Sequence, residues 1–505
     1  MKNVLKTTLL ATVFSAVLWG GQSAEAATYS EAEKLVRQAE GYAGTVKWQV
    51  SYEYTKTIAR PDMKNFNAAK EYRLKAQTAI NTLPAASQRN VLNDRLKKNV
   101  DTYVNRAIAY IDAITAGEKI IRQQSNLNTH ISSGNLEKLE NTYHVLSEEI
   151  RKQAKLLYRV HGQSTRDAFL VKYKAPAESL IKGVKHEVTS SMLLDDIQAL
   201  KLPEGISSSV VPVKVNEYQS YDTYINYPTL QTALNNKYNA TMSKIVLPQN
   251  KMKDLITEVA IENGIPPEIL KAIAYQESGD TLKFQQFKNN GEPIVSSDNG
   301  IGIMQITNHP TENVEDLKYN TRNNIEVGAE LLKEKWSWTG DELPKINDGD
   351  PDVLENWYFA VLAYNGRSSI NHPTNSGNYQ NKIFEFIRSS SQVKVFNFNN
   401  LVYDISVNNG ILDFTPKLQY ETNIQNKTTQ IYKAGQTLKI TTSTKFRPEP
   451  NTIVKEKYTL AAGNEVQILE KGISDATGIN HFVFYKVKVN STGDIGYVFS
   501  GAFAK

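Results

Sequence analysis

Residues 266–278 read Pro-Pro-Glu-Ile-Leu-Lys-Ala-Ile-Ala-Tyr-Gln-Glu-Ser, and they decide the fold of the region in which chemistry is expected. Proline pre-sets the first turn of a helix, and the glutamate that follows suits its positive end. In this helix Ile269, Ile273 and Glu277 share one face, so a carboxylate stands at the end of an apolar stripe. Burial would raise its pKa and keep it protonated, as donation to a glycosidic oxygen requires. Spacing alone leaves open a glutamate at a fraying helix end that simply reaches water.

Further motifs follow this glutamate in a fixed order. They are Glu277-Ser278, then Ser296, then Gly300-Ile301-Gly302-Ile303-Met304-Gln305-Ile306-Thr307, then Asn324-Ile325, then Ala363-Tyr364-Asn365-Gly366, and finally Tyr379. This series resembles the lytic transglycosylases of the soluble-lytic type, which belong to the lysozyme-like superfamily. The resemblance extends over roughly residues 250–388. Any one motif is weak, but their order makes the signal specific.

Several residues receive roles from their chemistry. Gly300 and Gly302 allow the backbone to approach a sugar closely, and Gln305 can hydrogen-bond that sugar in two directions. Met304 fits a sugar face and a core position equally well. Asn324 is expected to hold its helix against the active-site loop.

The resemblance implies further roles. Glu277 is implied to be the catalytic acid and base, and Tyr364 to be its hydrogen-bond partner. Ser296 is implied to contact the substrate near its acetamido group. Asn365 and Tyr379 are expected among the substrate-binding residues, and Ser278 is expected to support the site.

The implied reaction uses a single carboxylate, whereas ordinary glycosidases use two. Glu277 would protonate the leaving oxygen of a MurNAc–GlcNAc bond, the substrate's acetamido group would assist, and a 1,6-anhydro ring would form. A hydrolytic muramidase remains an alternative, with Asp280, Glu292 or Asp298 as the second carboxylate. A wall-binding scaffold that has lost activity is a third possibility. The loop after Glu277 and the acidic insertion 337–352 are longer than expected, and both could shape the groove.

The region before this domain is helical in pattern and basic. Residues 28–200 contain few glycines, and their Lys and Arg outnumber their Asp and Glu, whereas residues 251–390 are acidic. Tyrosines and cations are interspersed along these helices, which by itself also fits ordinary core rings and solvated faces. The run Arg159-Val160-His161-Gly162-Gln163-Ser164-Thr165-Arg166-Asp167 resembles the N-terminal region of Bacillaceae surface-layer proteins. That resemblance implies binding to an anionic secondary cell wall polymer.

The C-terminal part switches to alternating, β-branched residues. Residues 393–414 are predicted to form strands around a hairpin turn at Asn408-Asn409-Gly410, and 465–469 and 484–489 are predicted strands of a small barrel. Residues 438–505 resemble bacterial SH3-like domains, which implies a possible wall-peptide ligand. A barrel that merely packs on its neighbour is the alternative.

Composition limits the remaining possibilities. The 505 residues suggest roughly three domains. Lys2 and Lys6, an apolar run and Ala24-Glu25-Ala26 predict a secretory signal peptide, and no later stretch is apolar enough to span a membrane. There is no cysteine, so disulfides and thiolate metal sites are excluded. Neither a metal, a cofactor nor nucleic acid is expected, and the protein is predicted to be secreted and associated with a Gram-positive wall.

The predicted fold class is therefore multidomain: an all-α helical bundle, a mainly α lysozyme-like domain and a small all-β SH3-like barrel. The predicted boundaries are a signal peptide at 1–26, the wall-polymer-binding bundle at 28–200, a linker at 201–245, the transglycosylase domain at 246–390, a β-hairpin connector at 391–437 and the SH3-like domain at 438–505.

Overall fold

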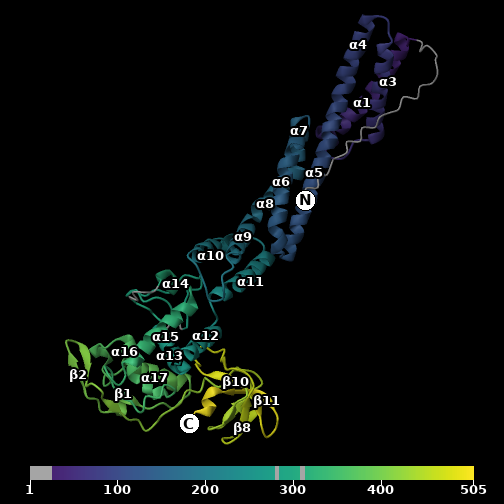
Figure 1. Ribbon diagram of the computed structural model, residues 1–505. Helices are drawn as coiled ribbons and strands as arrows, with labels where there is room; N and C mark the ends of the chain where they lie inside the picture. Colours follow the sequence, from purple (N-terminus) through teal and green to yellow (C-terminus); the bar gives the residue numbers. More distant parts are fainter. Residues whose placement is uncertain (1–25, 279–283, 308–312, 505) are drawn as a thin grey trace. The chain divides into compact units, whose positions relative to one another are not determined.

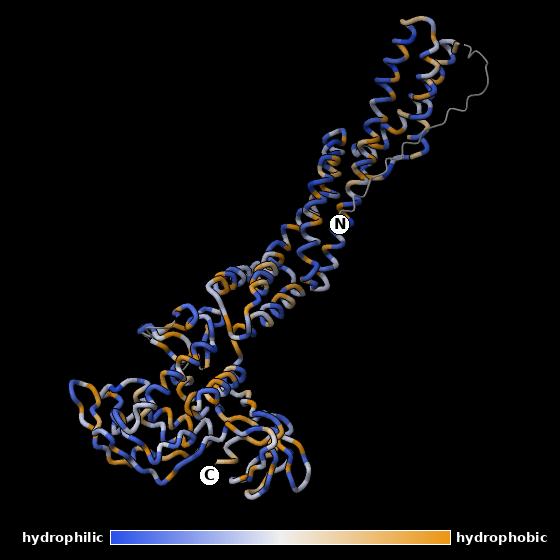
Figure 2. The backbone as a smooth tube through the Cα atoms, in the orientation of Figure 1, coloured by the Kyte–Doolittle hydropathy of each residue, from blue (hydrophilic) through white to orange (hydrophobic). Residues whose placement is uncertain are grey.

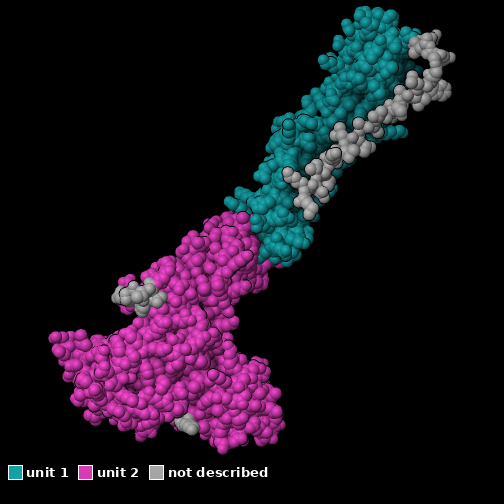
Figure 3. All heavy atoms as spheres, in the orientation of Figure 1, with its two compact units in different colours: residues 1–185 teal, residues 186–505 magenta. Residues whose placement is uncertain are grey.

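The computed structural model describes residues 26–278, 284–307 and 313–504. The predicted signal peptide, apart from Ala26, therefore lies outside the described residues. The chain divides into two compact units, residues 1–185 and 186–505 (Figure 3). Among the described residues, no helix combines the length and the apolarity needed to cross a membrane.

The first unit is helical, as the residue pattern predicts. Its α-helices are α1 (Tyr29–Gln49), α2 (Tyr52–Thr55), α3 (Met63–Asn81), α4 (Ala86–Leu96), α5 (Thr102–Ser133), α6 (Leu136–Tyr158), α7 (Gln163–Phe169) and α8 (Ala175–Gly183). Hydrophilic and hydrophobic residues alternate along these helices (Figure 2), as in amphipathic helices that bury one face. Helix α1 packs on α3, and α5 packs along α6 (Figure 1).

The α5–α6 turn shows how local sequence sets a boundary in this unit. Gly134 ends α5 in the left-handed conformation at φ 66°, which glycine adopts without strain. The side chain of Asn135 then accepts a hydrogen bond from the Lys138 backbone N–H at 3.1 Å and caps α6. A glycine and a capping asparagine thus set the boundary between the two helices.

The second unit begins with segments that differ from the prediction. Residues 201–245, predicted to be a linker, instead contain helices α10 (Val210–Ser220) and α11 (Pro228–Ile245), which follow α9 (Lys185–Ala199). The segment is also fastened down: the Thr321 hydroxyl donates to the Gly205 carbonyl at 2.6 Å, and the Ser207 hydroxyl donates to the Gly291 carbonyl at 2.8 Å. Buried partners that are distant in sequence order this stretch, and no local periodicity reports them.

A helical domain follows, around one hydrophobic core. Its helices are α12 (Gln249–Glu262), α13 (Pro267–Glu277), α14 (Val314–Tyr319), α15 (Thr321–Ser337), α16 (Tyr358–Asn365) and α17 (Tyr379–Ser390). Helix α13 packs against α12 and α17, and α16 packs against α15 and α17 (Figure 1). Every residue of α13 from Pro267 to Ala274 is buried, so the helix is enclosed on all sides and not on one face alone.

The connector is only partly the predicted pair of strands. A hairpin joins β2 (Ile405–Asn408) to β3 (Ile411–Phe414), with Asn409 and Gly410 at φ 50° and 78°, as a two-residue hairpin turn requires. Residues 393–404, predicted to be strand, form none. Val393 and Val395 instead bury their side chains in the core of the helical domain, so burial and not pairing explains their apolar pattern.

The C-terminal region is an antiparallel β structure with its own core. Its strands are β5 (Thr437–Lys439), β6 (Thr444–Phe446), β7 (Tyr458–Leu460), β8 (Glu465–Ile468), β9 (Ile473–Ser474), β10 (Val483–Val489) and β11 (Ile495–Phe499). The main sheet has the order β11-β10-β8-β5, β9 pairs with β10, and β6 pairs with β7. Strands β8 and β10 coincide with the two segments that the sequence predicts.

Candidate active site

Glu277 is the last residue of α13 and is half-buried. Burial raises the pKa of its carboxyl from 4.5 to about 7, and the negative charge of Asp298 contributes in the same direction. Tyr379, the first residue of α17, donates its hydroxyl hydrogen to Glu277 Oε1, which opposes the shift. The carboxyl is therefore about half protonated near neutral pH, the state that suits a group that both donates and accepts a proton.

Two tyrosines, the buried Tyr379 and the half-buried Tyr364, lie beside this carboxyl. Burial and the negative charge of Glu277 raise the pKa of both Tyr364 and Tyr379 well above the ordinary value, so both remain hydrogen-bond donors. The expected pairing of Tyr364 with Glu277 is wrong, because the Tyr364 hydroxyl donates to the Met304 carbonyl at 3.0 Å. Tyr379, expected only to contact substrate, is the tyrosine that bonds the carboxyl. Residue type and order along the chain could not distinguish the two rings.

Two buried side-chain amides hydrogen-bond the backbone of the glycine-rich loop, residues 300–307. Gln286 Oε1 accepts from the Ile303 backbone N–H at 2.8 Å, and Asn324 Oδ1 accepts from the Met304 N–H at 3.0 Å. A Cβ on Gly302 would lie 2.3 Å from Gln286 Oε1, and its φ of 71° also favours glycine. Asn324 thus occupies its predicted supporting position, whereas sequence reasoning missed Gln286. Its only signal was a pair of glutamines, Gln285 and Gln286, between two phenylalanines.

The rim of the loop is a tight turn around Gly300. The Ser296 hydroxyl accepts from the Gly300 N–H at 2.9 Å and donates to Asp298 Oδ1 at 2.6 Å. A Cβ on Gly300 would lie 2.6 Å from Gln305 Oε1 and 2.7 Å from Ser296 Oγ, so the absence of a side chain allows these two polar groups to flank the turn. Gln305, at φ 48°, donates to the Gly302 carbonyl at 2.7 Å. The turn therefore brings Ser296 and Gln305, two of the predicted site residues, close together.

Three other candidate site residues make contacts within the protein itself. Met304 is 1% exposed and packs against Gly328, which settles its side chain in the core and not on a sugar-facing surface. The Ser278 hydroxyl donates to the Ala274 carbonyl and accepts from the Phe284 N–H, each at 2.8 Å, and so secures the end of α13. Asn365 is exposed and accepts from Asn371 Nδ2 at 3.0 Å.

The rival carboxylates differ from Glu277. Glu292 is exposed and pairs with Lys288 at 3.0 Å. Asp298 is also exposed, and the Ser296 hydroxyl lowers the pKa of its carboxyl, which keeps it ionised. Asp280 lies outside the described residues. Within the described ranges, no group of three or more His, Asp or Glu side chains is arranged to hold a metal ion.

The two long insertions are built into the fold. Phe284 and Phe287, in the loop after Glu277, are buried. In the acidic insertion, β1 (Lys345–Ile346) pairs in parallel with β4 (Gln419–Tyr420) of the connector. The sequence suggested that both segments shape the groove, and the structure gives these parts of them a packing role.

Comparison with known proteins finds two families, each matching a different segment of the chain. Residues 254–387 match the family model of the transglycosylase SLT domain, and residues 47–178 match that of the SbsC C-terminal domain. The chain thus carries an SLT transglycosylase domain and, before it, an SbsC-like S-layer domain. The SLT match supports peptidoglycan cleavage of the transglycosylase type.

The individual relatives are surface-layer proteins. An S-layer protein of Geobacillus stearothermophilus is 28% identical over 198 residues, which is 36% of this chain and only 16% of the relative. The crystal structure of the N-terminal part of the S-layer protein SbsC is 24% identical, with a TM-score of 0.37, over 42% of this chain and 54% of that one. A structure of SbsC domains 1–6 is 24% identical, with a TM-score of 0.35, over 43% and 33% of the two chains.

Proposed function

We propose that this protein cleaves the MurNAc–GlcNAc β-1,4 bond of peptidoglycan with Glu277 as its only catalytic carboxyl. The observation that carries the proposal is the half-buried Glu277 carboxyl, whose pKa is raised to about 7 and which accepts a hydrogen bond from Tyr379. Such a group can give up a proton and take one back within a single turnover.

The proposed reaction moves one proton out and one proton in. Protonated Glu277 transfers its proton to the leaving GlcNAc oxygen as the glycosidic bond breaks, and the MurNAc acetamido oxygen stabilises the cation at the anomeric carbon. The ionised Glu277 then removes the proton of the MurNAc 6-hydroxyl while that oxygen bonds to the anomeric carbon. A 1,6-anhydro ring results, no water is added, and Glu277 is protonated again.

The residues around the carboxyl have matching tasks. Tyr379 holds the carboxylate in place between the two proton transfers, since its own pKa keeps it protonated. Ser296, Gln305, Tyr364 and Asn365 are proposed to contact the glycan, with Ser296 nearest the acetamido group. Gly300, Gly302, Asn324 and Ser278 are proposed to keep the loop and the helix end in shape.

Hydrolysis is the competing outcome. Asp298 is ionised and near enough to raise the pKa of Glu277, so a water activated there would give a muramidase. Digestion of purified peptidoglycan, followed by mass spectrometry of the products, decides between the two reactions. We expect anhydro ends, and ends that carry added water would overturn the proposed lyase.

Glu277→Gln is the variant that tests the site. We expect turnover to fall below about one thousandth, because the amide cannot donate the proton, while the unfolding temperature stays at or above that of the wild type. Glu292→Gln, at an exposed carboxylate of the same domain, is the matched control and should retain full activity. Substantial activity in Glu277→Gln would disprove the assignment, and the chain would then be better explained as a scaffold or as an enzyme with another acid.

The helical N-terminal unit is proposed to bind an anionic secondary wall polymer. Lys47 lies 4.7 Å from the centroid of the Trp48 ring and 4.9 Å from that of Tyr103, and Arg106 lies 5.6 Å from the Tyr103 centroid. With His161 they line a pocket of about 170 Å³. Rings and cations together suit an acidic polysaccharide. The proposed location is accordingly outside the cell, on a Gram-positive wall, and the C-terminal β region is proposed to be SH3-like and to contact wall peptide.

Wall binding is tested on the full chain carrying Glu277→Gln, so that the walls stay intact. We expect sedimentation with purified walls that weakens as salt rises, and weaker binding after Lys47→Gln and Arg106→Gln together. Lys182→Gln, an exposed lysine of the same unit, should change nothing. Binding that ignores salt, or that the paired substitutions leave intact, would contradict the proposed surface.

A further inference from the structure

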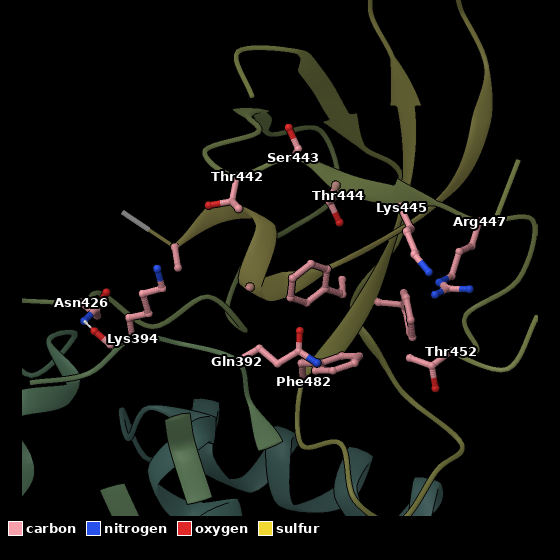
Figure 4. Close-up of a pocket in the computed structure, with 14 residues that line it drawn as sticks. Gln392, Lys394, Asn426, Thr442, Ser443, Thr444, Lys445, Arg447, Thr452 and Phe482 are labelled. Carbon is pink, nitrogen blue, oxygen red and sulfur yellow. Dashed lines mark hydrogen bonds between the residues drawn. The ribbon is translucent and has the colours of Figure 1, made fainter. Parts of the chain in front are cut away.

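A pocket of about 680 Å³ lies where the C-terminal β region meets the connector (Figure 4). Its volume is within the roughly 300–1,000 Å³ typical of small-ligand sites. In Figure 4, Lys394 and Asn426 of the connector lie at one side, and Lys445 and Arg447 of the β6 strand region lie at the other. None of the reactions proposed for Glu277 uses these residues.

The charge of the pocket has one sign. Lys394, Lys445 and Arg447 line it, and no Asp or Glu does. Among the described residues, neither Lys394 nor Arg447 takes part in an ion pair, and Lys445 has only a 3.8 Å contact with Glu456. Arg447 is 8% exposed, and one of its Nη atoms donates to the Val454 carbonyl. The other N–H groups of this guanidinium are shielded from water and can donate to an anion.

The floor of the pocket is apolar. Phe482 lies edge-on to Phe484 and to Phe499, with ring centroids 5.5 and 5.2 Å apart. A Cβ on Gly501 would lie 2.5 Å from the Phe499 ring, so only glycine at this position leaves room for the ring. A ligand that fills this floor gains from burying methyl or methylene groups.

A buried hydroxyl completes the lining. Thr444 is 5% exposed, and its Oγ1 has no hydrogen-bond partner among the described residues. Buried polar groups are nearly always paired, so an unpaired one at a pocket wall indicates an absent partner. Figure 4 shows Thr444 above the pocket, opposite Gln392 and Phe482.

We infer that this pocket binds a short peptide that ends in a free carboxylate, with the carboxylate at Arg447 and Lys445 and small aliphatic side chains on the phenylalanines. A phosphate-rich polymer is well hydrated along its length and would gain little from three phenylalanines in a closed floor. Alanine-rich wall peptides carry both methyl groups and carboxylates. The inference rests on the proposed wall-peptide contact of the C-terminal region and assigns it a site that includes the connector.

The experiment is calorimetric titration of the full chain with diacetyl-Lys-D-Ala-D-Ala. This peptide has no glycosidic bond, so the result is independent of whether Glu277 cleaves glycan. We expect saturable binding of the free acid and binding about tenfold weaker for the C-terminal amide, because a charge-assisted hydrogen bond is lost. Equal affinity for acid and amide, or tighter binding of inorganic phosphate than of the peptide, would overturn the inference.

Four variants assign the binding to this pocket. Arg447→Gln and Lys445→Gln should each weaken the free acid by about tenfold, and Lys445 is exposed, so its substitution does not endanger the β core. Lys488→Gln, an exposed lysine on β10 outside the pocket, should bind as the wild type does. Thr444→Val should weaken binding without lowering the unfolding temperature, since the hydroxyl has no partner to lose. Unchanged affinity in Arg447→Gln and Lys445→Gln would place the ligand elsewhere.

Discussion

The two ends of helix α13 bury ionisable groups in different ways. Near its start, the Glu268 carboxylate accepts from the Thr428 hydroxyl at 2.7 Å, and from the N–H and hydroxyl of Thr429 at 2.8 and 2.9 Å. Lys271 donates to Gln430 Oε1 at 2.5 Å and to the His481 carbonyl at 2.8 Å. At the end of the helix, Glu277 receives its one hydrogen bond between described residues from Tyr379. Groups whose bonding capacity is filled hold the fold, whereas a group left with spare capacity can react.

The end of α13 that carries Glu268 and Lys271 is also joined to segments distant in sequence. The partners of Glu268 and Lys271 come from residues 428–430 and 481, and Lys253 of α12 donates to the carbonyls of Asp475, Thr477 and Asn480 at 2.7 to 2.8 Å. The helix that carries Glu277 is therefore seated on the C-terminal region, although that region lies outside the stretch matched by the SLT family model. The predictions below test this contrast.

The largest effect on stability is expected at Lys271. Lys271→Ala leaves Gln430 and a backbone carbonyl buried without their donor and opens a cavity, so it should lower the free energy of unfolding by about 3–5 kcal/mol. Lys271→Met, which keeps the volume, should cost less. Denaturant unfolding measures both, and a neutral Lys271→Ala would mean that the junction does not support α13.

Tyr379→Phe should lower the rate without unfolding the protein. Losing one hydrogen bond to a charged group corresponds to a decrease of about ten- to hundredfold. Because that bond lowers the pKa of Glu277, its loss should raise this pKa and move the alkaline limb of the pH–rate profile to higher pH. Tyr364→Phe is the matched control, since its hydroxyl bonds a neutral carbonyl, and it should leave the limb in place. A limb that moves only in Tyr364→Phe would reverse the two assignments.

The alkaline limb itself follows from Glu277. A general acid must be protonated, and the pKa of this carboxyl is about 7, so cleavage should decline above about pH 7. Rates measured on purified peptidoglycan at constant ionic strength test this. Activity that keeps rising through pH 8 and 9 would show that the proton comes from another group.

The smallest effect is a pH-dependent difference in stability. Burial raises the pKa of Glu277 in the folded protein from 4.5 to about 7, so the folded state holds a proton that the unfolded chain releases. Its contribution is complete below about pH 4.5 and is lost as pH rises through about 7. The unfolding temperature of Glu277→Gln, which stays neutral, should therefore gain on that of the wild type between pH 5 and 8. A difference that does not vary with pH would contradict a buried, titrating carboxyl.

Much of this molecule could be read from local pattern. Periodicity predicts the helical first unit and the turn residue Gly410 predicts the connector hairpin, because these features depend on neighbours only a few residues away. The ordered motifs likewise pointed to Glu277, Ser296, Gln305 and Asn324 before any geometry was known. The predictions of a linker at 201–245 and of strand at 393–404 are wrong because the structure of these segments depends on contacts with distant segments.

What the sequence by itself determined is the set of chemical groups: a glutamate after an apolar helix, glycines where side chains cannot fit, and cations among rings in the first unit. Only the tertiary structure decided which tyrosine bonds Glu277, that Met304 belongs to the core, and that Gln286 supports the loop. It also decided that Lys253 and Lys271 join α12 and α13 to the C-terminal region. The physical reason is that burial and hydrogen-bond partners are properties of the packed chain, and the pKa of a carboxyl rises toward neutrality when packing removes its water.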